Sequence, residues 1–167
     1  MRPLRTCRPF FQGSNLNTWR PQPRICVKSL GLHWLAGRLL AAEVYDDSGR
    51  VKGVRPLGGS VEFGETARDA VIREFKEELG AEIAITGEPV FIENIFVHEG
   101  CPGHEIVVLF EVLLPSEDFE GKDCLTFRED NGVVCVARWF DIRDLDVPGG
   151  PELYPVGLKA HLERLGK

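Results

Sequence analysis

The stretch of sequence that decides the fold is GGSVEFGETARDAVIREFKEELGA, which runs from Gly58 to Ala81. Its first part contains three glycines, and its second part is rich in carboxylates. Residues three and four apart lie on the same face of a helix, so Glu74 would face both Glu77 and Glu78. Like charges placed in this way repel each other by roughly a few tenths of a kcal/mol per pair. Taken alone, such a segment is typical of a solvated helix face with an ion pair between Arg73 and Glu77, so the residues around it must decide whether the carboxylates have a function.

Local signals place this helix at Ala67 to Leu79. Thr66 is a suitable N-cap, and Asp69 at the third helical position gives an approximate capping box, with Asp in place of the usual Glu or Gln. Gly80 follows the last helical residue, where a left-handed backbone commonly ends a helix. One face of the helix carries an apolar stripe that we expect to pack against a sheet, formed by Ala67, Ala70, Val71, Phe75 and Leu79.

Short apolar and alternating runs lie on both sides of this helix and predict strands. From Ile25 to the glycine loop, the runs are broken at residues 36–37 and 46–49 by residues typical of turns. After the helix, the candidate strands are residues 81–87, 90–99, 104–115 and 133–142. The spacing of Leu158, Leu162 and Leu165 predicts a short amphipathic helix at the C-terminus. This order favours the α/β class, as an α/β/α sandwich with a mixed β-sheet.

Length and charge are consistent with a single domain preceded by a tail. The chain has 167 residues and no apolar run near the roughly 20 residues of a transmembrane helix, so a membrane partner is not expected. We expect residues 1–24 to form a basic, Pro/Arg-rich tail and residues 25–167 to form the domain. The tail can be interpreted as a transit peptide, a nucleic-acid arm or a flexible extension; its prolines favour the extension, because they oppose a targeting helix.

The part of the chain after the tail is acidic. From Ser29 onward it carries 14 basic and 26 acidic residues, a formal charge of −12. Binding of nucleic acid depends largely on the neutralisation of phosphates by Lys and Arg, so nucleic acid is not an expected partner. The five cysteines form no C-x-x-C pair, which argues against a zinc site. Their odd number, with no disulfide framework in the sequence, favours a reducing, cytoplasmic location.

The clustered carboxylates are well suited to a divalent cation. Carboxylate oxygens are ligands of Mg²⁺ and Mn²⁺, which commonly bind substrate phosphates at the same time. Such a cation would remove the repulsion between the glutamates and help to activate water against a phosphoanhydride. Gly58, Gly59 and Gly64 would let the backbone approach the metal or the phosphates closely.

The full pattern resembles the signature of the Nudix hydrolases. It consists of Gly59, five residues, Glu65, seven residues, Arg73-Glu74, an apolar Phe75, Lys76, Glu77-Glu78, Leu79, Gly80 and Ala81. Every fixed position of the signature is present. The soft departure is Ala81, where a larger aliphatic residue is usual, and it concerns packing more than chemistry. The strand pattern from about Ile25 to Leu165 is similar to the α/β/α sandwich of that family.

The resemblance implies hydrolysis of a nucleoside diphosphate linked to another moiety, with Mg²⁺, or Mn²⁺ in its place. Carried over by position, Glu77 and Glu78 would bind the metal, and Glu74 would be a ligand or the base that activates water. The Gly59 carbonyl would add a metal contact. Glu65 and Arg73 would form a salt bridge that orients the loop and the glutamates.

The general base is open, because members of the family often take it from a loop outside the signature. The candidates are Glu99, Glu105, Glu129 and Asp130, and we favour Glu129 in the segment FREDNG. Arg55 could bind a substrate phosphate or simply lie on the surface. His98 and His104 could bind a metal, although their spacing matches no standard motif and is consistent with solvated loop residues. Trp139 and Phe140 fit core packing better than base stacking.

Two classes of function are consistent with the sequence. The first is a cation-dependent pyrophosphohydrolase acting on a small nucleotide, and the second is a Nudix-like sensor that binds a nucleotide without hydrolysing it. Sensors of this kind usually lose glutamates of the signature or carry an added DNA-binding domain. This chain keeps every glutamate, so the enzyme is favoured. Nucleoside triphosphates, ADP-ribose, nucleotide sugars and dinucleoside polyphosphates remain open as substrates, and the oligomeric state is also open, with a homodimer as one option.

Overall fold

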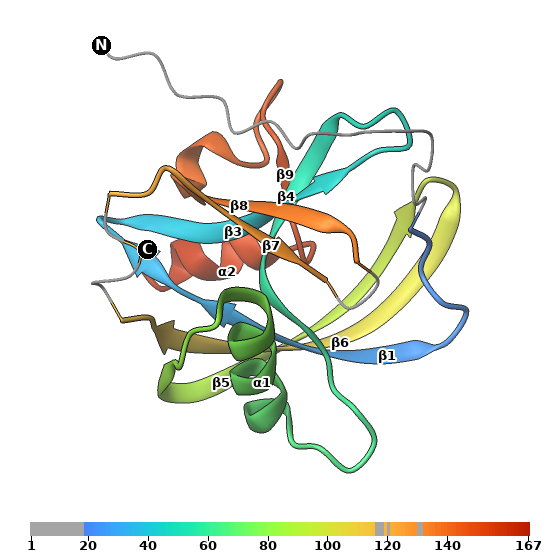
Figure 1. Ribbon diagram of the computed structural model, residues 1–167. Coiled ribbons are helices and arrows are strands. Elements are labelled where there is room, and N and C mark those ends of the chain that lie inside the picture. Colours follow the sequence, from blue (N-terminus) through green and yellow to red (C-terminus); the bar gives the residue numbers. More distant parts are fainter. Residues whose placement is uncertain (1–18, 116–118, 120, 130–131) are drawn as a thin grey trace.

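The computed structural model of the chain describes residues 19–115, 119, 121–129 and 132–167. Its elements, shown in Figure 1, are in chain order β1 (Ile25–Leu32), β2 (Trp34–Leu35), β3 (Arg38–Tyr45), β4 (Val51–Ser60), α1 (Ala67–Leu79), β5 (Ala84–His98), β6 (Cys101–Leu113), β7 (Cys124–Arg128), β8 (Val134–Phe140), the 3₁₀ turn η2 (Ile142–Asp144), β9 (Glu152–Leu153) and α2 (Leu158–Arg164). None of the helices in these residues has the length and apolarity needed to cross a membrane.

The strands form one mixed sheet. Seven of them lie in the order β5-β6-β1-β4-β3-β8-β7, while β2 pairs with β3 and β9 pairs with β4. The pairs β1–β6 and β4–β9 are parallel, and the other pairs are antiparallel. Strand β4 joins the two halves of the sheet, because its first part pairs with β3 and its last part pairs with β1. It ends at Ser60, within the glycine-rich stretch.

Helices cover both faces of this sheet, so the predicted α/β/α sandwich is confirmed. Along β3, Leu40 and Ala42 belong to the hydrophobic cluster on the α1 side, whereas Leu39 and Ala41 belong to the cluster on the α2 side. Neighbouring side chains of a strand point to opposite faces, so this alternation is expected for a strand covered on both sides. The same alternation occurs along β6. Figure 1 shows α1 and α2 on opposite sides of the sheet.

Helix α1 has the predicted bounds and caps. The Oγ1 of Thr66 accepts a hydrogen bond from the backbone N–H of Asp69 at 3.1 Å, and its hydroxyl donates to the Asp69 carboxylate at 2.6 Å. Gly80 has a φ of 65° and its N–H donates to the Lys76 carbonyl, which ends the helix in the left-handed conformation expected there. Three residues of the predicted stripe are fully buried: Ala70, Val71 and Phe75.

The structure differs from the predicted elements in three details. The candidate strands at 81–87 and 90–99 are one strand, β5, which continues through an irregularity between Thr86 and Val90, where Gly87 has a positive φ. Strand β7 was not predicted, because its five residues CLTFR are too short for a clear alternation. The C-terminal helix buries Leu158 and Leu162 as expected, but it ends at Arg164, and Leu165 is 57% exposed.

Part of the predicted N-terminal tail contacts the domain. Residues 1–18 lie outside the described part of the chain. The Trp19 ring is stacked on Phe96 at 6.5 Å between ring centroids and meets His98 edge-on at 5.2 Å. Arg20 donates a hydrogen bond to the Asp47 carboxylate at 2.9 Å. The segment just before β1 is therefore held against β5 and against the turn that follows β3.

Substitution of Gly31 by Ala tests the contact between β1 and α1. A Cβ at this position would lie 2.6 Å from Cε2 of the buried Phe75 and 3.0 Å from Cγ2 of Val112. We expect Gly31→Ala to lower the free energy of unfolding by roughly 1–3 kcal/mol, because overpacking forces neighbouring side chains out of place. Urea denaturation measures this loss. The Gly31→Ala/Phe75→Leu double variant should lose less than the sum of the single variants, and strict additivity would contradict this packing.

Candidate functional site

Two adjacent glycines near the end of β4 let the strand pass very close to its neighbours. Gly58 has a φ of 128°, and a Cβ there would lie 2.2 Å from the carbonyl oxygen of Ser29. A Cβ on Gly59 would lie 2.1 Å from Oε1 of Glu74. Since neither position has room for a side chain, the carboxylate of Glu74 lies directly against the strand backbone. The signature helix and the glycine loop therefore meet at this point.

Arg73 connects the loop to the helix. Its Nε and Nη2 donate to the two carboxylate oxygens of Glu65 at 2.8 and 3.0 Å, and Nη2 also donates to the Ser60 carbonyl at 3.0 Å. The bidentate pairing lowers the pKa of Glu65 below its usual value. Glu65 accepts a further hydrogen bond from the Glu62 backbone N–H. The salt bridge between Glu65 and Arg73 that the family resemblance implies is thus present.

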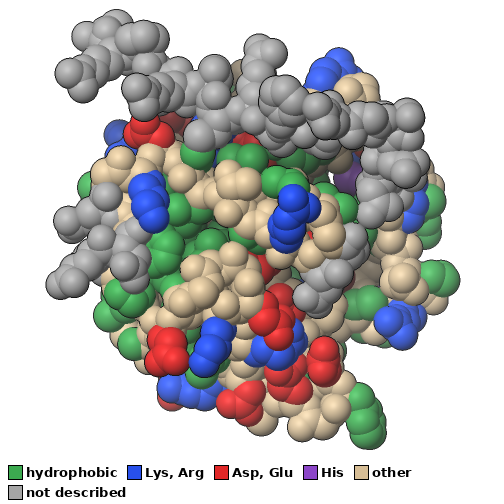
Figure 2. Space-filling model, viewed as in Figure 1, with side chains coloured by type: hydrophobic (Ala, Val, Ile, Leu, Met, Phe, Trp, Pro, Cys, Tyr) green, Lys and Arg blue, Asp and Glu red, His purple; other side chains and the backbone are tan. Residues whose placement is uncertain are grey.

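The same guanidinium also holds two of the clustered glutamates. Its Nη1 donates to Oε1 of Glu74 and to Oε2 of Glu77, each at 3.0 Å. Hydrogen bonding to Glu65 is the largest cause of the raised pKa of Arg73, which therefore stays charged. One cation thus offsets much of the repulsion among neighbouring carboxylates. Figure 2 shows acidic and basic side chains interleaved over the part of the surface formed by α1.

Glu78 is in a different environment. Its Oε2 is buried and has no hydrogen-bond partner among the described residues. The pKa of Glu78 is raised to about 8, mainly by burial. The nearby charges of Glu74 and Glu129 contribute to the rise, while Arg55 and a hydrogen bond from the Gly58 backbone oppose it. A buried carboxylate with an unpaired oxygen is costly unless a cation or a proton compensates it.

Among the described candidate bases outside the signature, Glu99, Glu105 and Glu129, it is Glu129 that the structure brings to Glu78. It contributes to the raised pKa of Glu78 and, with Glu78, to that of the Cys135 thiol on β8, which burial raises to about 12. Sequence analysis did not find Cys135 as a neighbour of the site, because that contact depends on the pairing of β8 with β7. Asp130 lies outside the described residues.

The other residues considered from the sequence lie elsewhere. Glu99 pairs with Lys52 at the turn between β5 and β6, at 3.3 Å. Glu105 accepts a hydrogen bond from Asn94 at 3.3 Å. His98 is buried against Trp19, whereas Nε2 of His104 lies 3.0 Å from the Glu93 carboxylate. The interpretation of His98 as a solvated loop residue was therefore wrong, and the two histidines contact different partners.

Two basic residues lie next to the carboxylates. Nη2 of Arg55 donates to the Gly58 carbonyl at 3.2 Å, and Arg55 lowers the pKa of Glu78, so its side chain is part of the site. Nζ of Lys28 donates to Oγ of Ser60 at 2.8 Å. Burial lowers the pKa of Lys28, and so does the charge of Arg55. Sequence analysis missed Lys28; a single lysine inside the apolar strand run ICVKSLGL was the available signal.

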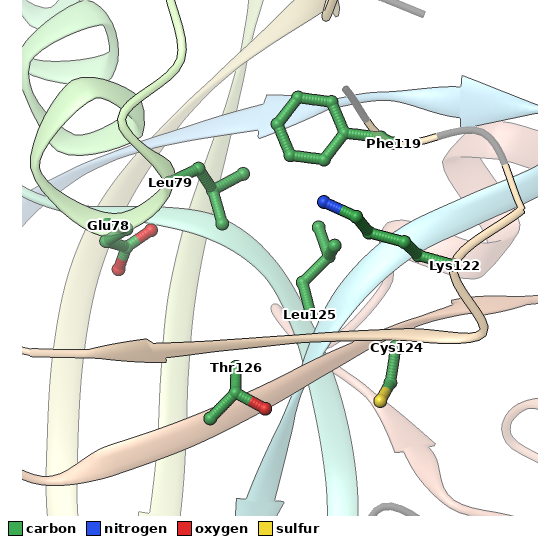
Figure 3. A pocket seen from close by; sticks show the side chains of 7 residues that line it. All are labelled: Glu78, Leu79, Phe119, Lys122, Cys124, Leu125 and Thr126. Carbon is green, nitrogen blue, oxygen red and sulfur yellow. The ribbon is translucent and has the colours of Figure 1, made fainter. Parts of the chain in front are cut away.

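Two cavities adjoin this region. One, of about 210 Å³, is shown in Figure 3; Glu78 and Leu79 enter it from α1, and the other lining side chains come from β7 and the segment before it. The amino group of Lys122 lies over the Phe119 ring at one side of this cavity. The second, of about 220 Å³, lies beside Lys28 and Ser60 and is closed on one side by the segment that contains Trp19 and Arg24.

The family model described as the NUDIX domain matches residues 36–157. Among solved structures, the MutT NUDIX hydrolase of Burkholderia pseudomallei is similar with a TM-score of 0.53 and 21% identity, over 83% of this chain and 97% of that chain. The ORF135 protein of E. coli is similar with a TM-score of 0.52 and 20% identity, over 91% of this chain and 95% of that chain. A NUDIX-family hydrolase of Clostridium perfringens is similar with a TM-score of 0.51 and 15% identity, over 83% of this chain and 97% of that chain. A comparison with curated proteins found no match.

The environment of Glu78 predicts a pH dependence of stability. Its pKa is about 8 in the folded chain, against an ordinary value of 4.5 for a glutamate that the fold does not bury. Between these values the folded state holds the proton more tightly, so the wild type should lose stability as the pH rises from about 4.5 to about 8, by at most ~1.4 kcal/mol per pH unit. Glu78→Gln removes this contribution. Urea denaturation of both proteins in EDTA measures the free energy of unfolding at each pH. Across this range the stability of the variant should rise relative to that of the wild type, and parallel pH curves would contradict the prediction.

Proposed function

Because the chain belongs to the Nudix family, we propose that it is a cation-dependent pyrophosphohydrolase whose substrate is a nucleoside diphosphate linked to another moiety. The observation that carries this proposal is the buried, unpaired oxygen of Glu78. It lies in a site that also contains Glu74, Glu129 and Arg55. Negative charge concentrated beside the half-buried guanidinium of Arg55 suits a cation together with an anionic substrate.

Mg²⁺, or Mn²⁺ in its place, fits the donors of this site. Three carboxylates of α1, those of Glu74, Glu77 and Glu78, and the Gly59 carbonyl are oxygen ligands of the kind both ions prefer. Within residues 19–115, 119, 121–129 and 132–167, no three acidic, histidine or cysteine side chains already surround a common point as a cation site. Glu74 and Glu77 are engaged with Arg73, whereas Oε2 of Glu78 is unpaired. We propose Glu78 as the first of these ligands.

The proposed roles of the chain's own residues follow from their positions. A bound cation would neutralise phosphate oxygens and lower the pKa of a water molecule. Arg55 would donate hydrogen bonds to a substrate phosphate, and Glu129 would accept the proton of the attacking water. The water oxygen forms a bond to phosphorus while the bond from phosphorus to the bridging oxygen breaks. Arg73 and Glu65 would keep the glycine loop and Glu74 in position.

The sensor remains the alternative, and the substrate within this class is open. A nucleotide that binds without turnover would identify the sensor. We keep a small-molecule nucleotide as the expected partner. The cytoplasmic location also stays a prediction from the cysteines of the sequence, and the disulfide bond of Cys124 in this structure argues against it. Turnover of a panel of nucleoside triphosphates, ADP-ribose, nucleotide sugars and dinucleoside polyphosphates, with Mg²⁺ or Mn²⁺, tests the proposal directly. Binding without release of a product from any of them would contradict it.

Charge removal on α1 tests the role of the carboxylates. Glu77→Gln keeps the size of the side chain and its helix propensity but removes a charge. We expect turnover of the best substrate to fall by at least ~100-fold at saturating Mg²⁺, since charge neutralisation provides much of the catalysis in phosphoryl transfer. Lys76→Gln is the matched control, because Lys76 is the exposed neighbour outside the fixed signature, and it should stay near the wild-type rate. Equal rates for all three proteins would exclude a catalytic role for Glu77.

Arg55→Ala tests the proposed phosphate contact. The loss of a guanidinium that binds phosphate should raise KM or lower kcat, so that kcat/KM falls roughly 10- to 1,000-fold. Arg68→Ala is the control, because Arg68 lies in the first turn of α1, outside the fixed signature. Arg55→Lys should recover only part of the loss, because an ammonium cannot pair with phosphate in the bidentate manner. Unchanged kcat/KM in Arg55→Ala would leave Arg55 as a surface residue.

A further inference from the structure

One part of the sheet face on the α1 side carries apolar side chains without a cover. Along β5, Val90 and Ile92 pack into the cluster on the α2 side. Successive strand residues point to opposite faces, so Phe91, Ile95 and Val97 face the α1 side. Phe91 pairs with Val108 of β6, and Val108 belongs to the α1-side cluster, which confirms this orientation.

Strand β1 contributes two more apolar residues to the same face. The Oγ of Ser29 donates to the Ala67 carbonyl at the start of α1, so Ser29 faces the α1 side, as do Ile25 and Val27. The strand register places Ile25 and Ile95 on either side of His104, in one row across three strands. We call this surface the β1–β5 patch, and its members are Ile25, Val27, Phe91, Ile95 and Val97.

Helix α1 does not extend over this patch. It covers the other end of the face, where Phe75 packs over Gly31, and Figure 1 shows β1 and β6 continuing beyond it. The exposed fractions of the patch side chains are therefore large for apolar residues: Ile25 60%, Val27 41%, Phe91 66%, Ile95 68% and Val97 66%. Side chains of this kind normally lie under a helix or against a partner.

The edge of the sheet beside the patch is also open. Strand β5 is the last in the strand order, and its fifteen residues contain no lysine or arginine. Its Pro89 and the irregularity between Thr86 and Val90, which also protect an edge, lie before the segment that carries the patch residues. Natural edge strands commonly use such charges to prevent pairing with another chain. A long edge strand with an exposed apolar face is thus suited to contact with a second sheet.

We propose that the β1–β5 patch is the interface of a homodimer of this chain. Its five side chains expose on the order of 500 Å² of apolar surface, close to the roughly 800 Å² per partner that a stable dimer buries, with the rest available along the β5 edge. The charged side chains within the patch, Glu93 and His104, contact each other at 3.0 Å. This contact reduces the charge repulsion between two copies that each carry a net charge of −6.

The same geometry places the second copy near the glycine loop. The N–H of Val61 donates to the Val27 carbonyl at 2.9 Å, so the loop leaves the sheet beside the patch. Phe63, two residues further along, is fully exposed, at 109% of its reference area. The dimer would border the loop and leave the carboxylates of α1 accessible to substrate. The inference does not depend on the proposed hydrolysis.

Analytical ultracentrifugation of the full chain from 1 to 200 µM tests the proposal. We expect the wild type to sediment as a dimer, and Phe91→Glu and Ile95→Lys to raise the dimer dissociation constant by roughly 100-fold or more, because each places a charge in an apolar interface. Far-UV circular dichroism should be unchanged, since both side chains are exposed. Val51→Lys is the matched control, because Val51 is 43% exposed at the start of β4, outside the patch, and its dimer should persist.

Two sedimentation results would overturn the proposal that the β1–β5 patch is a dimer interface. A wild type that is monomeric throughout the concentration range would do so, as would a dimer that survives both patch substitutions. The N-terminal residues of the same chain are the competing occupant, and the Phe10→Ser/Phe11→Ser variant of the full chain addresses them. If this variant is a dimer like the wild type, a second copy is supported as the occupant of the patch. If this variant is monomeric while Phe91→Glu and Ile95→Lys remain dimers, the interface lies in the N-terminal segment and the patch proposal fails.

Discussion

The contacts of one guanidinium hold the candidate site together. Arg73 bonds to Glu65 in the loop, to the Ser60 backbone at the end of β4, and to two glutamates of its own helix. A single rigid, planar cation can make these contacts simultaneously, whereas a lysine could not. The relative positions of the loop and the glutamates thus depend on the hydrogen bonds of Arg73. The same cation offsets the repulsion among the carboxylates that surround it.

Much of the fold could be predicted from local sequence signals, and the failures have physical causes. The bounds of α1 depend on its own cap residues, Thr66 and Gly80, so they were predicted correctly. The continuity of β5 depends on its pairing with β6, which carries the strand through Gly87 and Pro89. Strand β7 is stabilised by its neighbour β8 and not by its own short sequence. Elements that depend on distant partners are therefore the ones that local patterns miss.

The same distinction applies to the site. The residues of the signature share a short segment, so their grouping could be read from spacing. The proximity of Glu129, Lys28 and Cys135 is set by the strand order, which places β1, β4, β8 and the end of β7 around the C-terminal half of α1. No local pattern contains that information. The difference between Glu78 and its neighbour Glu77 also appears only in three dimensions, because it depends on which carboxylate the sheet buries.

The parallel pairing of β1 with β6 has a consequence for how the chain folds. Ile25 pairs with His104, so the centre of the sheet joins residues roughly 80 positions apart, and such contacts close late because a long loop must first lose its entropy. Gly58 and Gly59 pair with Leu30 and Ser29 of that same β1. The hairpin of β3 and β4 can form early from local contacts. The glycine loop that precedes α1 is fixed only after β1 has paired with β4 and β6. We therefore expect Glu74 to reach its final position against Gly59 late in folding.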